Sequence, residues 1–67
     1  MFREYDVVEL TQTLSDAVRV GTIGTVLMVY PGAEPEYEVE FMDEHDRTIE
    51  VCTVSSDKIR LVTKGAQ

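Results

Sequence analysis

The chain has 67 residues, with 13 acidic against 6 basic side chains and a formal net charge of −7. A chain this short supports one domain with a small core, which leaves no room for a deep active-site cavity. Its negative charge repels phosphate backbones, so it disfavours nucleic acid and favours basic proteins or cations as partners.

The cysteine content and the N-terminal residues predict a protein of a reducing compartment. Cys52 is the single cysteine, which excludes an internal disulfide, and its place in the apolar run Ile49 to Val54 favours a buried structural thiol over a reactive one. Met1 to Asp6 lacks the apolar segment of a signal peptide. No run approaches the about 20 apolar residues of a membrane helix, so we expect a soluble, cytoplasmic protein.

The first part of the chain predicts one strand and a long loop. Residues 5–10 are rich in β-branched side chains and predict a strand that buries Val8 and Leu10. The alternation is lost between Thr11 and Val20, which favours a partly packed loop. A short helix is the alternative, although ten residues are too few to form one on propensity alone.

Two glycines precede the second predicted strand. Gly21 and Gly24 allow a positive φ or a close backbone approach, so we expect them to turn the chain and bend the strand sharply. Residues 26–30 are apolar at every position, which favours a β-bulge that lets both Val26 and Val29 reach the core.

The most regular pattern follows a proline-rich turn at residues 31–36. In the next residues Tyr37, Val39 and Phe41 alternate with glutamates, which predicts a strand with one face in the core and the other in water.

The remaining pattern predicts two more strands. The expected segments are a polar turn at 43–47, a strand at 48–54, one turn of 3₁₀ helix at 55–57, a closing strand at 59–62 and a frayed tail at 63–67. Ile49 and Val51 are expected to point inward from the fourth strand.

Together these elements predict an all-β fold, a small five-stranded SH3-like barrel with a strongly bent second strand. It would form one domain over residues 1–67 with an ordered core at about 5–62. An OB-like barrel is the alternative, but that fold often carries a helix between its third and fourth strands. The predicted core comprises Val8, Leu10, Val26, Val29, Tyr37, Val39, Phe41, Ile49, Val51, Ile59 and Leu61.

Several separated segments carry a resemblance to a known family. They are Asp6–Thr11, Gly21–Val26, Val29–Tyr30, Tyr37–Phe41 and Ile59–Leu61. In this order they resemble the small bacterial family known as domain of unknown function 4926 (DUF4926). The glycine element is also similar to the KOW motif of ribosomal proteins and transcription factors, which implies an SH3-like fold. The resemblance implies a small stand-alone domain and brings no established activity and no functional residues.

Members of that family often carry a glycine in the turn after the third strand. Here the corresponding residues, Glu44 to Asp46, include none. The conformation of this turn is therefore left open by the sequence.

No catalytic, cofactor or metal site is predicted. His45 is the single histidine and lies in an expected exposed turn far in sequence from Cys52, so no nucleophile has a neighbouring base. Residues 43–46 lack the ligand spacing of a calcium loop. The Gly21–Gly24 element lacks the ending of a phosphate-binding loop. We expect a protein that is not an enzyme.

The leading hypothesis is an acidic protein-interaction module that binds a larger, basic protein and has a regulatory or antitoxin-like role. Its candidate binding face comprises Glu36, Glu38, Glu40 and Glu50. Glu50 is expected opposite Glu40, a like-charge pair that a basic partner would relieve. Edge strands of an open barrel offer a second route, either to a homo-oligomer or to a strand from a partner. The plainer alternative is that the acidic side chains serve only solubility.

A hypothesis of another class is a KOW-like module that binds RNA or a ribonucleoprotein. It requires the basic residues to gather near one end of the barrel, and the net charge opposes it. Those residues are Arg19, Lys58, Arg60 and Lys64.

Overall fold

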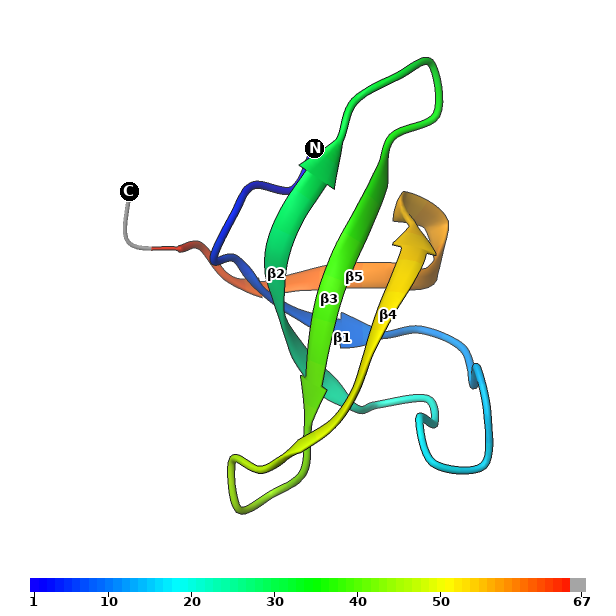
Figure 1. Cartoon of the computed structure of the whole chain (residues 1–67), viewed down its shortest axis with the longest axis vertical. Coiled ribbons are helices and arrows are strands. Elements are labelled where there is room, and N and C mark those ends of the chain that lie inside the picture. The colour runs from blue at the N-terminus through cyan, green and yellow to red at the C-terminus, as the bar shows by residue number, and fades with distance from the viewer. Residues whose placement is uncertain (66–67) are drawn as a thin grey trace.

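The alternating segments form five strands, and a computed structural model describes them within residues 1–65 (Figure 1). The strands are β1 (Val7–Leu10), β2 (Ile23–Tyr30), β3 (Glu36–Met42), β4 (Thr48–Ser55) and β5 (Ile59–Thr63). The predicted 3₁₀ turn is η1 (Ser56–Lys58), which lies between the last two strands.

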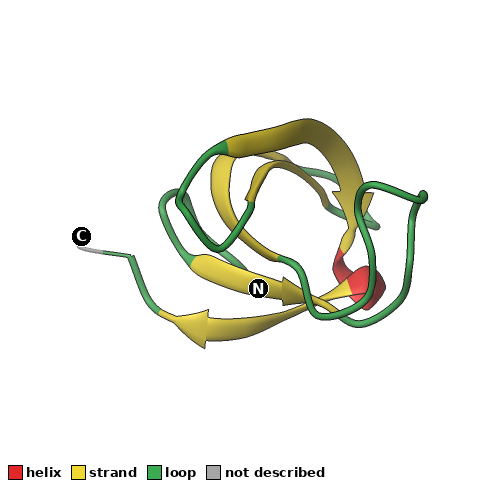
Figure 2. Cartoon of the chain, turned by 90° about the horizontal axis from the view of Figure 1, so that it is seen from below, coloured by secondary structure: helices red, strands yellow, loops and turns green. Residues whose placement is uncertain are grey.

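All neighbouring strands are antiparallel, in the order β4-β3-β2-β1-β5. The strands curl around a common interior, as the view along the barrel shows (Figure 2). This arrangement confirms the predicted all-β, five-stranded SH3-like barrel. Residues 1–65 contain no α-helix, so the helix often found in an OB-like barrel is not present there. The edges of the sheet are β4 and β5.

The bent second strand is confirmed, and a bulge accompanies the bend. The pairing of β2 with β3 shifts register between Val26 and Met28. Val26 is fully buried, and Val29 packs against the core on the far side of the shift. The extra residue therefore lets both side chains face inward, as the sequence predicts.

Gly21 and Gly24 each occupy a position that requires glycine, for different physical reasons. Gly21 has φ +91°, a conformation that side chains rarely adopt. At Gly24 a Cβ atom would lie 2.6 Å from Cγ1 of Val39 and 2.9 Å from Cδ1 of Phe41. Gly24 is required because β3 crosses close to it, and this close approach confirms the packing prediction.

The buried core is built mostly from the predicted strands. Its members are Val8, Leu10, Val18, Val26, Tyr37, Val39, Phe41, Val54 and Ile59. Val18 and Val54 are absent from the predicted set. Val18 comes from the long loop, where its carbonyl accepts the N–H groups of Leu14 and Ser15 and its own N–H donates to Ser15 Oγ. These local bonds let a loop residue fill the barrel without a helix.

The predicted orientation of β4 is wrong. Ile49 and Val51 are 36% and 45% exposed, whereas Cys52 and Val54 face the core. Glu50 is on the same side of the strand as these two but stays exposed. A register shift between Phe41 and Met42 sets this phase. Because β4 carries apolar side chains on both faces, its hydrophobic pattern does not select one phase, and the pairing with β3 decides between them.

Leu61 also differs from the prediction, since 39% of its surface is exposed. It pairs with Val8, whose side chain is buried. However, β5 is an edge strand without a neighbour on its other side, and only its first residue, Ile59, is buried.

The two ends of the described chain are tied together by Asp6. Its carboxylate accepts the N–H of Gly65 at 2.7 Å and the N–H of Arg3 at 2.9 Å. The Gly65 bond, followed by the Arg3 bond, holds the pKa of Asp6 below its ordinary value of 3.8. Because the folded pKa is the lower one, the ionised group stabilises the fold above the unfolded pKa, and this contribution is lost as the pH falls through the folded pKa. Of the predicted tail, Thr63 is the last residue of β5 and Gly65 bonds to Asp6, while residues 66–67 lie outside the described residues.

The N-terminal segment also contributes to the end of the barrel. The Phe2 ring meets the buried Tyr37 ring edge to face, with centroids 5.3 Å apart. The Phe2 N–H donates to the Tyr37 hydroxyl at 3.3 Å. Phe2, which precedes the predicted start of the core at residue 5, therefore packs against a core residue.

Candidate protein-binding surface

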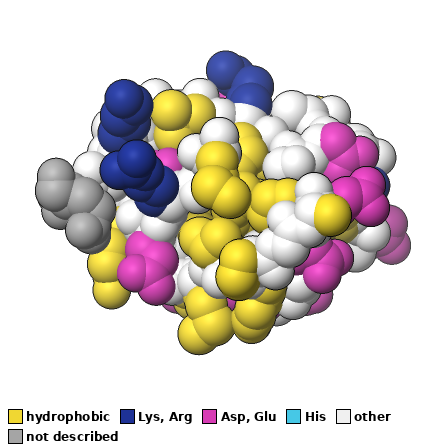
Figure 3. Space-filling model, turned by 90° about the horizontal axis from the view of Figure 1, so that it is seen from above, with side chains coloured by type: hydrophobic (Ala, Val, Ile, Leu, Met, Phe, Trp, Pro, Cys, Tyr) yellow, Lys and Arg dark blue, Asp and Glu magenta, His cyan; other side chains and the backbone are white. Residues whose placement is uncertain are grey.

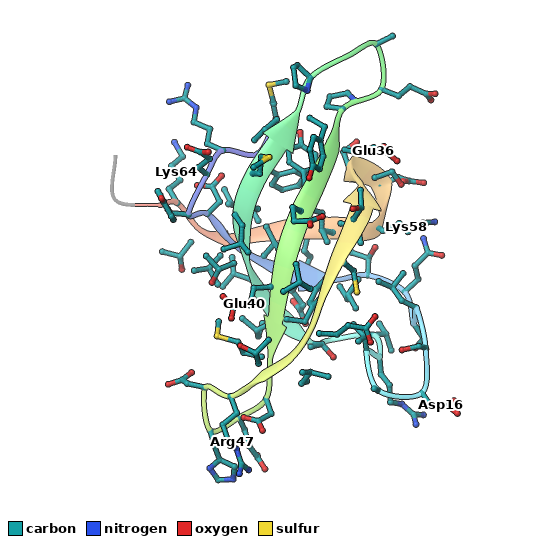
Figure 4. The ribbon with its side chains drawn as sticks, viewed as in Figure 1. Asp16, Glu36, Glu40, Arg47, Lys58 and Lys64 are labelled. Carbon is teal, nitrogen blue, oxygen red and sulfur yellow. The ribbon has the colours of Figure 1, made fainter. Side chains whose placement is uncertain are left out.

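The regular alternation of β3 places three glutamates on its outer side. Opposite them on β4 are three residues of the same outer face, with Glu36 facing Ser55, Glu38 facing Thr53 and Glu40 facing Val51. We call Glu36, Glu38 and Glu40 the acidic row. Figure 4 shows Glu36 and Glu40 near opposite ends of β3, so the acidic row follows most of the strand.

Hydroxyl groups of β4 orient two members of the acidic row. Thr53 Oγ1 donates to Glu38 Oε1 at 2.6 Å, and Thr48 Oγ1 donates to Glu40 Oε2. Both carboxylates are thus drawn toward β4, the edge of the sheet. A carboxylate oxygen accepts more than one hydrogen bond, so each group keeps acceptor capacity for a partner.

Glu50 does not join the acidic row. It pairs with Phe41 on the inner side of the sheet, while Glu40 pairs with Val51. The expected like-charge pair of Glu40 and Glu50 is therefore wrong. The register shift near Met42 moves Glu50 to the other face.

Glu50 instead interacts with the single cysteine. Cys52 Sγ donates to Glu50 Oε2 at 3.3 Å, and its side chain packs against the core. Desolvation and then the Glu50 contact raise the pKa of Cys52 to about 11. Since the thiolate is the nucleophile, the raised pKa disfavours reaction of this thiol at neutral pH.

The outer edge of β4 carries backbone groups without a strand partner. Val26 bonds through its N–H to Asp6 and through its carbonyl to Tyr5, so its backbone groups point toward β1. Backbone groups alternate in direction along antiparallel strands. Val26 pairs with Val39, and Val39 pairs with Cys52, so the backbone N–H and C=O groups of Cys52 point toward β3. The backbone groups of the adjacent residues Val51 and Thr53 therefore point away from the sheet.

An apolar hollow of about 420 Å³ lies beside the beginning of β4. Its apolar lining comes from Val20, Ile23, Met42 and Ile49, and Asp43 and Glu44 contribute its acidic rim. Ile23 and Met42 are direct cross-strand neighbours. Ile49, which lines the hollow, and Val51, two residues further along β4, are both exposed.

The turn between β3 and β4 uses its acidic residues internally. Asp43 Oδ1 accepts the N–H groups of His45 and Arg47, and Asp43 Oδ2 lies 3.2 Å from Arg47 Nε. Asp46 has φ +61°, a conformation that asparagine and aspartate tolerate better than most residues. Asp46 thus supplies a left-handed backbone conformation, which glycine often supplies in turns. Within residues 1–65, no group of three or more potential metal-ligating side chains comes together.

The basic residues of the alternative hypothesis do not gather at one end. Lys58 lies in η1 and Lys64 follows the end of β5, and Figure 4 shows them on opposite sides of the molecule. Arg60 forms an ion pair with Glu9. One end of the barrel shows hydrophobic side chains in its middle, with acidic groups on both sides of them (Figure 3).

Among the described residues, no helix is long and apolar enough to cross a membrane.

The comparisons with known proteins identify a family. No curated protein and no solved structure matches the chain. A family model matches residues 4–61, from before β1 into β5. On this match the chain belongs to the family described as domain of unknown function (DUF4926).

Proposed function

We propose that the chain is a non-enzymatic protein-interaction module that binds a basic partner protein through the acidic row. The observation that carries this proposal is the orientation of Glu38 and Glu40 toward an open sheet edge by hydroxyls of β4. Side chains that are already ordered lose less conformational entropy on binding.

The charge distribution supports a basic partner. A net charge of −7 attracts cationic proteins over a distance and raises their association rate. Arg47 lies in the turn that follows β3 and forms an ion pair there with Asp43. A regulatory or antitoxin-like role would follow if the partner's basic surface is the one that binds nucleic acid.

The nucleophile and base chemistry of the described residues supports a non-enzymatic role. His45 lies in the exposed turn, with 66% of its side chain accessible. Its backbone N–H bonds to Asp43, and Cys52 lies in the following strand with a raised pKa. The proposed role is therefore binding of a partner, without catalysis.

Changing Glu38 and Glu40 together to glutamine is expected to slow association with the partner about tenfold at low ionic strength and to flatten its dependence on salt. The glutamines keep similar size and remove the charges that attract a basic surface. The measurement is recovery of partners from a host extract by the immobilised chain, followed by stopped-flow association with the purified partner.

The matched control changes Glu4 and Asp16 to Gln and Asn. Both residues are exposed and lie outside the sheet, so the net charge changes equally without touching the acidic row. Equal association rates for the two double variants would refute a specific role for the acidic row. Capture of RNA in place of protein would support the KOW-like hypothesis.

A further inference from the structure

We propose that the partner contributes an extended segment with Lys or Arg at alternate positions, which pairs with the free edge of β4 as an added strand. This inference rests on the proposed function and specifies both the form of the partner and the strand that receives it. The proposed function and the strand addition can be tested separately, because the acidic row can bind a basic surface without any added strand.

The edge of β4 has the properties of a strand acceptor. It is eight residues long, and Val51 and Thr53 direct their backbone groups outward. Among residues 1–65, neither has a backbone hydrogen bond outside the sheet. The strand also lacks the lysine or proline that blocks many natural edges. An incoming strand would satisfy these groups and cover the exposed side chain of Val51.

The acidic row supplies the charge complementarity. An added strand would lie about 5 Å from β4 and about 10 Å from β3. Its outward side chains would cross Thr53 and Val51 to reach Glu38 and Glu40, which hydroxyls already hold toward β4. Lys and Arg suit this span, because their aliphatic stems pack on apolar surface while the charged ends reach the carboxylates.

The hollow beside the beginning of β4 extends the same site. Ile49 belongs both to β4 and to the hollow, whose rim includes Asp43 and Glu44. An aliphatic residue at one end of the incoming segment would bury apolar surface there. The preferred segment thus combines alternate basic residues with one apolar anchor.

The opposite edge of the sheet does not suit the same segment. Along β5 and its flanks lie Lys58, Arg60 and Lys64, which would repel a basic strand. A second copy of the chain pairing β4 with β4 would bring two acidic rows together, and each chain carries a net charge of −7. The charges therefore favour a basic segment from another protein over a second copy.

The test uses a synthetic peptide of alternating valine and lysine, matched in length to β4, and NMR of the isotopically labelled chain. We expect binding to protect the amides of Val51 and Thr53 from hydrogen exchange. A peptide of alternating valine and glutamate should not bind. A lysine peptide with N-methyl groups along one edge keeps its charge and should bind about tenfold more weakly through the loss of edge hydrogen bonds.

Variants of the chain separate strand addition from charge recognition. Val51→Pro removes an N–H that points away from the sheet, a position where an edge strand tolerates proline. Val51→Ala is its matched control, because it shortens the side chain and keeps the N–H. We expect about tenfold weaker peptide binding for Val51→Pro than for Val51→Ala.

Several results would overturn the inference. Equal binding by the methylated and unmethylated peptides, or absence of binding by either, would exclude strand addition. If the Glu38 and Glu40 variant alone reduced binding, the proposed function would stand without the added strand. Protection that appears without peptide and grows with protein concentration would identify a second copy as the occupant. If Val51→Pro fails to fold, the methylated peptide still decides.

Discussion

Replacing Phe41 with alanine is expected to lower the free energy of unfolding by about 3–5 kcal/mol, the range for truncation of a buried phenylalanine. Phe41 is fully buried in the middle of the core and lies opposite Gly24. Small proteins have total stabilities of about 5–15 kcal/mol, so this single change should leave a large unfolded fraction. Urea denaturation followed by circular dichroism measures the loss.

The matched control is Tyr30→Ala. Tyr30 is also an aromatic residue of the sheet, but it is exposed at the end of β2. Its truncation should cost less than about 1 kcal/mol, because little buried volume is removed. If Phe41→Ala and Tyr30→Ala destabilised the chain equally, the assignment of the core would be wrong.

Replacing Gly24 with alanine should destabilise the fold by about 1–3 kcal/mol, and valine should cost more, since overpacking forces neighbours apart. The new Cβ would lie 2.6 Å from Cγ1 of Val39 and 3.0 Å from the carbonyl oxygen of Glu40. Valine side chains are stiff, and Glu40 presents its backbone, so neither neighbour yields easily. Thermal unfolding of both variants measures the effect.

Gly32 provides the control for this substitution. A Cβ at Gly32 would meet no atom within 4 Å, and its φ is not positive. Gly32→Ala should therefore leave stability unchanged or raise it by about 0.4–1 kcal/mol through the unfolded state. If the Gly24→Ala variant were as stable as the Gly32→Ala variant, this would contradict the close packing of β2 against β3.

The parts of the fold that sequence predicts are those with a strict local signal. In β3 every second residue from Glu36 to Glu40 is charged, so only one phase buries the apolar side chains. In β2 the glycine pair and the uninterrupted apolar run indicate the bend and the bulge. Both predictions depend on residues near one another in the chain.

The parts that sequence misses depend on contacts between distant segments. The phase of β4 is set by its pairing with β3, since Ile49 and Cys52 are equally compatible with an inner face. Val18 is buried because its loop folds back over the barrel, and no periodicity marks it. Leu61 is exposed because β5 has no neighbour on one side.

The candidate binding surface also has one feature that the sequence predicts and others that depend on the pairing of distant segments. The acidic row is visible in the alternation of β3, whereas its contacts with Thr48 and Thr53 follow from the register of β4. Glu50 is excluded from the acidic row by that same register. Residues 49–54 contain neither proline nor lysine, two residue types that often block edge strands. That β4 lies at the edge follows only from the order of the strands.

The central claim is that β4 presents a free edge beside the acidic row, and residue-resolved amide hydrogen exchange of the unbound chain tests it most directly. Cys52 points its backbone toward β3, so its amide should exchange slowly. The amides of Val51 and Thr53 point outward and should exchange much faster. Protection of Val51 and Thr53 as strong as that of Cys52 would mean that the edge is already covered, which would contradict the account.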